Sequence, residues 1–225
     1  MQDRILDRAA RVLGSLLFGA LAVAQVYRLH LHVQLMALAG RVVWRDVLLE
    51  IVPTLANLAF LALLAVLFLV RGPAIRKATG IVPRVVGALG MFGLAIGLTL
   101  LRLQGPAPVV PVLLWTGTAI AAVAHAAAVW ILATLGRSFS VMPEARRLVV
   151  SGPYALVRHP LYAAEILAGL GLVLMQPSPW AWIALAGHVG CALGRIHYEE
   201  QVLGAAFPEY GAYRQRVPQL IPGLR

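Results

Sequence analysis

The sequence predicts an all-α, polytopic integral membrane protein, built as a bundle of about six transmembrane helices. Two observations predict this fold class. Hydrophobic residues make up 60% of the chain and charged residues only 12%, whereas soluble domains carry about 25% charged residues. Several apolar runs also reach about 18 residues or more, which is long enough for a helix to cross the hydrocarbon core of a bilayer.

The apolar runs give the expected positions of the spans. We expect them near residues 9–27, 47–70, 84–103, 109–135, 160–176 and 179–196. The short turn Gln176-Pro177-Ser178-Pro179 joins the last two spans as a helical hairpin. The N-terminal run also resembles a signal peptide, but we expect it to be retained as the first span. Residues 28–46 mix basic and apolar side chains, so we expect them to lie along the membrane surface.

The basic residues divide unequally between the two sides of this topology. Fifteen of the 19 lysines and arginines fall in the N-terminus, the segments 71–84 and 137–158, and the C-terminal tail. Positively charged loops stay in the cytoplasm, so we expect both termini to be cytoplasmic. The same distribution assigns the net charge of +10 to membrane topology and not to nucleic-acid binding. Because arginine greatly outnumbers lysine, which suggests a GC-rich bacterial genome, we expect a bacterial inner membrane.

Glycines recur at helical spacing in two of the expected spans. Such stripes let the backbones of neighbouring membrane helices approach closely. The glycines concerned are Gly87, Gly90, Gly93 and Gly97 in the third span and Gly190 and Gly194 in the sixth.

Polar residues suited to chemistry gather in residues 137–165 and 195–216. There the chain reads Gly152-Pro153-Tyr154 and then Arg158-His159-Pro160-Leu161-Tyr162, followed about forty residues later by Arg195, Glu199 and Glu200 and by a Val-Pro…Ile-Pro ending. These linked motifs resemble the isoprenylcysteine carboxyl methyltransferase family, which is related to membrane phospholipid methyltransferases. The resemblance covers residues 135–224, and the first four spans match only in hydrophobicity.

The resemblance implies a division of labour along the chain. Residues 1–134 would be transmembrane scaffold, and residues 135–225 would be the catalytic region. In that region the C-terminal helical hairpin and the tail would form a cytoplasm-facing cofactor pocket. The activity implied is transfer of a methyl group from S-adenosylmethionine to the carboxylate of a lipophilic acceptor that enters from the bilayer.

The resemblance also implies roles for individual residues. Arg195 would be the catalytic residue that orients the acceptor carboxylate. The cofactor-binding residues would be Arg146, Arg147, Leu148, Val149, Tyr154, His159, Pro160, Leu161, Tyr162 and Glu199.

The residues themselves support part of this assignment. Proline suits the first position of a helix, so Pro160 is expected to begin one. The amides of Leu161 and Tyr162 would then point out of a positively polarised helix end, which suits an anion such as the cofactor carboxylate. An ordinary membrane helix that starts with proline is the simpler interpretation.

Neighbouring helical residues point about 100° apart, so Glu199 and Glu200 are expected to have different tasks. We expect Glu199 to face the cofactor and Glu200 to be structural. Arg195 lies four residues before Glu199 and could instead form an ion pair with it.

Other polar residues allow simpler interpretations. Arg146 and Arg147 could be topology signals, and Tyr210 and Tyr213 could anchor the tail at the membrane interface. Glu165 is a buried acid that could pair with Arg158 or Arg195. His125 and His188 are interpreted as packing residues, and no metal site is expected.

Three other functions are compatible with the sequence. An NADPH-dependent sterol-type reductase shares the Arg-His-Pro-x-Tyr-x-x-Glu pattern, although the acidic pair at 199–200 suits a cationic cofactor better. A phospholipid or thiol methyltransferase differs only in the acceptor. A non-enzymatic membrane scaffold would bind the cofactor without transferring a methyl group. The sequence leaves the oligomeric state and the identity of the acceptor open.

Overall fold

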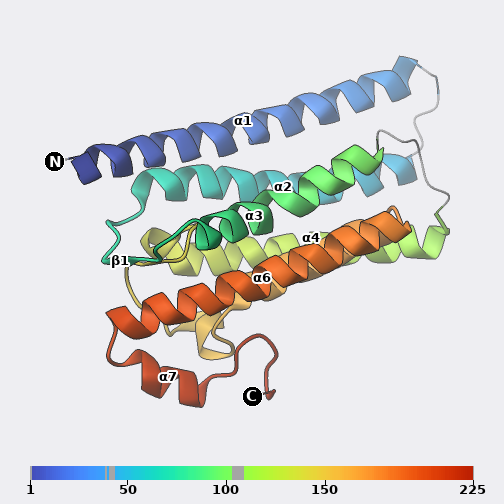
Figure 1. Cartoon of the computed structure of the whole chain (residues 1–225). Helices are drawn as coiled ribbons and strands as arrows, with labels where there is room; N and C mark the ends of the chain where they lie inside the picture. Colours follow the sequence, from blue (N-terminus) through green and yellow to red (C-terminus); the bar gives the residue numbers. More distant parts are fainter. Residues whose placement is uncertain (1, 39, 41–43, 103–108, 225) are drawn as a thin grey trace.

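The computed structural model describes residues 2–38, 40, 44–102 and 109–224. Its long elements are helices that run back and forth beside one another (Figure 1). They are α1 (Gln2–Leu38), α2 (Trp44–Val70), α3 (Val82–Arg102), α4 (Pro111–Leu135), α5 (Pro160–Leu174) and α6 (Pro179–Ala206), with the short helix α7 (Tyr210–Arg216) beyond them. Each long helix covers one of the predicted apolar runs, and the all-α class is confirmed.

Four of these helices contain stretches long and apolar enough to cross a membrane. The stretches are Asp7–Leu38, Ile51–Val70, Val82–Leu101 and Pro111–Ser138. The apolar helix α5 has only 15 residues, and α6 carries His188 and Arg195 in its otherwise apolar part. The chain is therefore an integral membrane protein with four candidate spans among the described residues. The predicted number of about six stays a prediction.

The first helix corrects the interpretation of residues 28–38 as a separate surface segment. Helix α1 continues without a break to Leu38, because no glycine or proline interrupts the chain between Gly19 and Gly40. Gly40 has a φ of 61°, a conformation that glycine adopts at little cost and that ends helices. The remainder of the predicted segment includes residues 39 and 41–43, which lie outside the described residues.

Helices α4 and α5 approach each other most closely at two glycines. A Cβ atom on Gly171 would lie 2.6 Å from the backbone oxygen of Gly117 and 2.6 Å from the backbone nitrogen of Ala121. A Cβ atom on Gly117 would lie 2.5 Å from the backbone oxygen of Gly171. Since neither backbone can move aside cheaply, the absence of side chains at both positions sets the distance between the helices.

The predicted glycine stripes are borne out in part where α3 meets α6. A Cβ on Gly194 would lie 3.0 Å from Val86, and a Cβ on Gly90 would lie 2.8 Å from the Arg195 side chain. Gly190, in contrast, has open space where a Cβ would be. It is therefore not a close-packing residue.

A small antiparallel strand pair ties two loops together at one end of the bundle. Strand β1 (Arg76–Lys77) pairs with β2 (Glu144–Ala145), with Arg76 opposite Ala145. This pair was not predicted from the sequence, because strands of two residues leave no periodic pattern to detect. Figure 1 shows that the N-terminus, β1, α7 and the C-terminal end of α6 lie at this same end.

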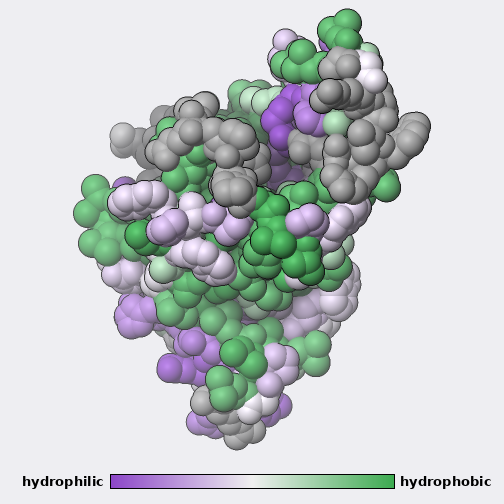
Figure 2. All heavy atoms as spheres, turned by 90° about the vertical axis from the view of Figure 1, so that its right-hand side faces the viewer, coloured by the Kyte–Doolittle hydropathy of each residue, from purple (hydrophilic) through white to green (hydrophobic). Residues whose placement is uncertain are grey.

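The surface of the bundle is largely apolar. Exposed large hydrophobic residues occur along the helices, for example Val123 with 70% and Val23 with 69% of the residue surface accessible. The exposed apolar sides of the helices suit contact with lipid tails. Figure 2 shows that hydrophobic and hydrophilic residues are mixed on the end of the bundle opposite the N-terminus.

Gly171→Ala is expected to destabilise the protein by about 2 kcal/mol, because the added methyl group must push two backbones apart. Gly190→Ala is the matched control, since it adds the same methyl group to open space and should be neutral or slightly stabilising. Thermal unfolding in detergent, followed by tryptophan fluorescence, measures both variants. Equal melting temperatures for Gly171→Ala and the unchanged protein would contradict the proposed contact.

Candidate functional site

A pocket lies at the end of the bundle where α4 ends and α5 begins. It has a volume of about 770 Å³, its open mouth included. Its walls come from α4, the loop 136–159, α5, α6 and α7. Of the predicted site residues, those that line it are Arg146, Arg147, Leu148, Val149, Tyr154, His159, Leu161, Tyr162, Arg195 and Glu199.

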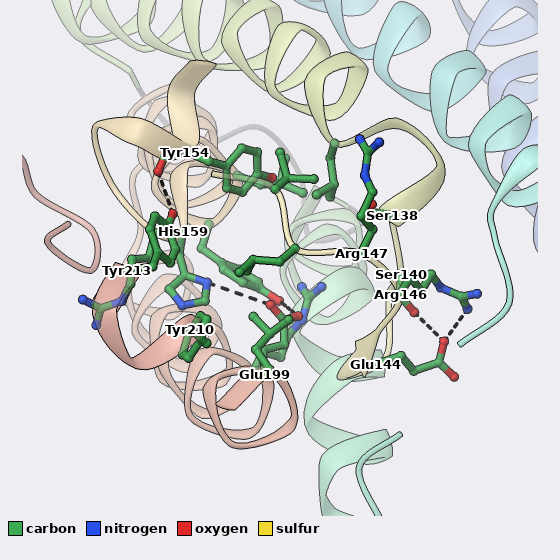
Figure 3. A pocket seen from close by; sticks show the side chains of 18 of the residues that line it. Ser138, Ser140, Glu144, Arg146, Arg147, Tyr154, His159, Glu199, Tyr210 and Tyr213 are labelled. Carbon is green, nitrogen blue, oxygen red and sulfur yellow. Dashed lines mark hydrogen bonds and ion pairs between the residues drawn. The ribbon is translucent and has the colours of Figure 1, made fainter. Parts of the chain in front are cut away.

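The Gly-Pro-Tyr motif turns the chain so that Tyr154 reaches the pocket. Gly152 opens the 3-10 helix Gly152–Ala155 with a φ of 60°, a value that side chains disfavour. A Cβ on Gly152 would also lie 3.2 Å from Thr134. The backbone oxygen of Tyr154 then accepts a hydrogen bond from the Tyr213 hydroxyl at 2.6 Å (Figure 3). This bond joins the loop to α7.

The predicted helix start at Pro160 is confirmed. Pro160 is the first residue of α5, and His159 precedes it with φ −127° and ψ 58°, outside the helical region. Leu161 and Tyr162 follow in the first turn and line the pocket, whereas Pro160 is not among the lining residues. Proline therefore acts here by fixing where the helix begins and how His159 is presented.

Glu199 is the acid on the aromatic side of the pocket, which Glu144 also lines. The Tyr162 hydroxyl donates a hydrogen bond to Oε1 of Glu199, and Nδ1 of His159 lies 3.9 Å from Oε2. Its side chain keeps 21% of its surface accessible. A partly accessible carboxylate in an aromatic pocket is a suitable partner for a cationic group of a ligand.

Glu200 faces away from Glu199 and holds the C-terminal tail. Its Oε1 accepts hydrogen bonds from Arg158 at 2.9 Å, from His159 at 3.2 Å and from Gln219 at 3.3 Å. Burial alone would raise the pKa of Glu200, but the bonds from His159, Arg158 and Gln219 outweigh it and lower the pKa to about 2. Glu200 is therefore ionised at neutral pH and neutralises Arg158. The different surroundings of the two acids agree with the predicted split of their tasks.

Arg195 is an almost fully enclosed charge of the pocket, with 2% of the residue accessible. Its Nη1 lies 3.4 Å from Glu165, and its Nη2 donates a hydrogen bond to the Val141 backbone oxygen at 3.3 Å. The guanidinium lies over the Tyr162 ring, 4.6 Å from the ring centroid. The alternative ion pair between Arg195 and Glu199 does not form, and the predicted pairing of Glu165 with Arg195 does.

The side chain of Arg146 points to structural partners. It donates hydrogen bonds to the Gly72 backbone oxygen and to Glu144, and Ser140 donates to the same carboxylate at 2.9 Å. In Figure 3, Arg146, Ser140 and Glu144 lie together, apart from the aromatic side of the pocket. The cofactor-binding role of Arg146 stays a prediction. The cofactor-binding roles of Arg147, Leu148 and Val149, which also line the pocket, stay predictions as well.

Tyr210 and Tyr213 are not the interface anchors considered from the sequence. Both are buried and line the pocket, because α7 folds back against α6. Burial, and next the charge of Glu200, raises the pKa of Tyr210 above its usual range. Burial also raises the pKa of Tyr213 to about 12. Both side chains therefore remain neutral hydroxyls at neutral pH.

Several lining residues were not predicted from the sequence, namely Leu135, Ser138, Ser140, Met142, Glu144 and Leu203. They carry no motif, and only the closing of the loop onto α6 brings them to the site. His125 lies away from it, with Nδ1 2.8 Å from the Ala121 backbone oxygen. His188 is buried in α6. Among the described residues, no three His, Cys, Asp or Glu side chains come together in a way that could hold a metal ion.

Residues 112–209 match the phospholipid methyltransferase family. This region contains α4 from its second residue, α5, the whole of α6 and the loop that carries the site. The resemblance to membrane methyltransferases predicted from the sequence is thereby confirmed for this part of the chain. The match starts before residue 135, where the predicted resemblance began, and stops short of the tail.

Curated relatives match the same share of the chain. A cobalt-zinc-cadmium resistance protein, CzcN, of Cupriavidus metallidurans is 40% identical over 100 residues, 41% of this chain and 45% of that protein. A nickel-cobalt-cadmium resistance protein, NccN, of Alcaligenes xylosoxydans xylosoxydans is 32% identical over 102 residues, 41% and 46% of the two chains. Protein-S-isoprenylcysteine O-methyltransferase B of Arabidopsis thaliana is 38% identical over 96 residues, 40% and 49%. The matched region thus spans about half the length of each relative.

Proposed function

We propose that this chain, whose residues 112–209 match the phospholipid methyltransferase family, is an S-adenosylmethionine-dependent membrane methyltransferase that acts on the carboxylate of a lipophilic acceptor. One observation carries the proposal. The matched region forms a pocket in which an accessible acid, Glu199, lies near an enclosed guanidinium, Arg195, with Tyr162 in contact with both. A cationic cofactor and an anionic acceptor need such a pair of opposite charges.

The residues of the pocket fit the cofactor. S-adenosylmethionine, when bound, supplies a methyl group on a positively charged sulfur. Glu199 offers a carboxylate to its cationic part, and Leu148, Val149 and Leu161 offer apolar walls. The Tyr210 hydroxyl is buried and has no hydrogen-bond partner among the described residues, so it is available to a ligand.

The proposed reaction would require little proton transfer by the protein. A carboxylate acceptor is already ionised at neutral pH, so one of its oxygens attacks the methyl carbon while the bond from that carbon to sulfur breaks. The electron pair of that bond stays on the sulfur, and no general base is required. Arg195 would orient the carboxylate, and the enclosed site would exclude water and align the reacting atoms.

The alternatives differ in what they predict. The family match favours a methyltransferase over an NADPH-dependent reductase, and a phospholipid or thiol acceptor differs from a carboxylate in the bond that the methyl group forms in the product. The names of two relatives refer to metal resistance, but these names do not indicate an acceptor. Purified protein incubated with radiolabelled S-adenosylmethionine and native membranes should yield a labelled, base-labile methyl ester. Binding of NADPH in place of S-adenosylmethionine would favour the reductase.

We also propose six spans with both termini in the cytoplasm. The basic N-terminus, the segments 71–84 and 137–158, and the tail gather at one end of the bundle (Figure 1), and positive charge stays inside. A water-soluble cofactor would then enter the pocket from the cytoplasm. The acceptor would enter from the bilayer, between helices.

Glu199→Gln is expected to weaken S-adenosylmethionine binding by about tenfold or more, because the carboxylate charge that faces the cofactor is lost. Glu200→Gln is the matched control. It should mainly lower the melting temperature, since Arg158 loses its charged partner, while the affinity changes much less. Isothermal titration of the folded variants measures both. Equal losses of affinity would contradict the assignment.

Arg195→Lys is expected to lower turnover by at least tenfold at saturating cofactor while the cofactor affinity stays within about twofold. Lysine keeps the charge but lacks the planar fork that matches a carboxylate. The readout is the initial rate of methyl transfer beside the dissociation constant of the cofactor. Lost cofactor binding with normal turnover would assign Arg195 to the cofactor site.

A cysteine at Leu224→Cys, in a Cys191→Ser background, should be protected from labelling only by a quencher on the cytoplasmic side. Leu224 is exposed in the tail, and the charge distribution puts the tail inside. Val110→Cys, exposed before α4, is the control for the opposite side. Protection of both cysteines from the same side would overturn the proposed topology.

A further inference from the structure

A second pocket lies beside the candidate site, at the same end of the bundle. It has a volume of about 880 Å³, its open mouth included, and is enclosed by the first turns of α1, the end of α2, the strand pair and the start of α3. Its charged lining residues are Asp7, Arg71, Lys77, Arg84 and Glu144. Glu144 and the neighbouring Met142 line both pockets, so the segment that carries β2 is the wall between them.

Arg71 is the unusual residue of this second pocket. The residue is 6% accessible, yet its guanidinium makes no hydrogen bond within the described part of the chain, and its Nε is buried without a partner. Its contacts are an ion pair with Asp7 at 3.6 Å and the Phe68 ring, whose centroid is 4.9 Å away. A buried guanidinium with unused donors is costly unless an anion meets it.

The two acids of the pocket do not fully neutralise Arg71, because each of them also pairs with other basic side chains. Asp7 accepts a hydrogen bond from Arg11 at 2.9 Å, and Glu144 is paired with Arg146 and Lys77. With Arg11 and Arg146 included, five positive charges surround two negative ones.

The surplus of positive charge also affects the pKa of Arg71. Burial, followed by the charge of Arg146, lowers the pKa of Arg71, against the opposing effects of Glu144 and Asp7. Arg84, on the open side, makes no side-chain hydrogen bond or ion pair among the described residues and is exposed. Arg71 at the base and Arg84 at the mouth therefore remain available to one anion.

The position of the pocket along the bundle indicates the source of that anion. Three candidate spans end at this level, since one begins at Asp7, one ends at Val70 and one begins at Val82. The ends of transmembrane helices lie among the lipid headgroups. Anionic lipids concentrate in the cytoplasmic leaflet and attract basic groups there.

We propose that this second pocket binds a phosphate group between Arg71 and Arg84, as carried by the headgroup of an anionic phospholipid. The lipid tails would lie against the apolar surface of the neighbouring helices. Free phosphate is the other source of the same chemistry. The site is separate from the methyl-transfer pocket; it rests on the cytoplasmic orientation proposed above and not on the methyltransferase activity.

The test uses delipidated full-length protein in a neutral detergent and measures bound lipid by native mass spectrometry. Short-chain phosphatidylglycerol should bind one per chain and at least tenfold more tightly than phosphatidylcholine of the same chain length. Arg84→Gln, an exposed position that should not affect folding, should weaken this binding about fivefold or more, and Arg71→Gln at least as much. Arg216→Gln removes an exposed arginine from α7 and should leave the affinity within about twofold.

Addition of inorganic phosphate distinguishes the two sources. If millimolar phosphate does not displace the lipid, the headgroup together with its chains is the ligand, which is the result expected. Displacement at that concentration would support the phosphate site but assign it to the free ion. Equal affinity for the anionic and zwitterionic lipids, or no effect of Arg84→Gln beyond that of Arg216→Gln, would overturn the proposal.

Discussion

A charge enclosed in an apolar helical bundle must be met by partners from other elements, and the site is organised around one such charge. Arg195 is met by Glu165 from α5, by the Val141 carbonyl from the loop after α4 and by the Tyr162 ring. Gly90 of α3 provides the space for its side chain. Three helices and the loop are thus fixed relative to one guanidinium, because leaving any of its partners unpaired inside the bundle would cost several kcal/mol.

The second acid of the adjacent pair organises the tail in a comparable way. Glu200 accepts hydrogen bonds from Arg158, His159 and Gln219. The backbone amides of Arg158 and His159 donate in turn to the carbonyls of Pro218 and Gln219. The same residues that precede α5 therefore hold the tail in place, and α7 brings Tyr210 and Tyr213 to the pocket. A tail without these bonds would leave that side of the pocket open.

The division of charge at this end of the bundle separates two kinds of site. In the first pocket Glu199 and Arg195 face aromatic and apolar walls, which suits a cationic ligand next to an anionic one. In the second pocket the side chains of Arg71 and Arg84 make no hydrogen bonds among the described residues, which suits an anion alone. The segment 142–144 separates the two, and the pairing of Glu144 with Arg146 keeps that acid from neutralising Arg71.

Composition and apolar length were sufficient to predict the membrane class and the positions of all six long helices, because the solvent that surrounds a membrane helix dictates its residues locally. The preference of proline for the first position of a helix was likewise sufficient to predict the start of α5 at Pro160. These are properties of short stretches of chain and need no knowledge of what packs against them. Most residues that line the pocket were instead implied by the family resemblance that the linked motifs carry.

The partners of those residues were decided only by the tertiary structure. Whether Arg195 pairs with Glu199 on its own helix or with Glu165 on another depends on how α5 and α6 cross. The burial of Tyr210 and Tyr213 depends on the return of α7, and the use of Arg146 on the approach of the loop to Gly72. Contacts between residues 30 to 75 positions apart follow from packing across the whole bundle, whereas helical periodicity relates only residues three or four positions apart.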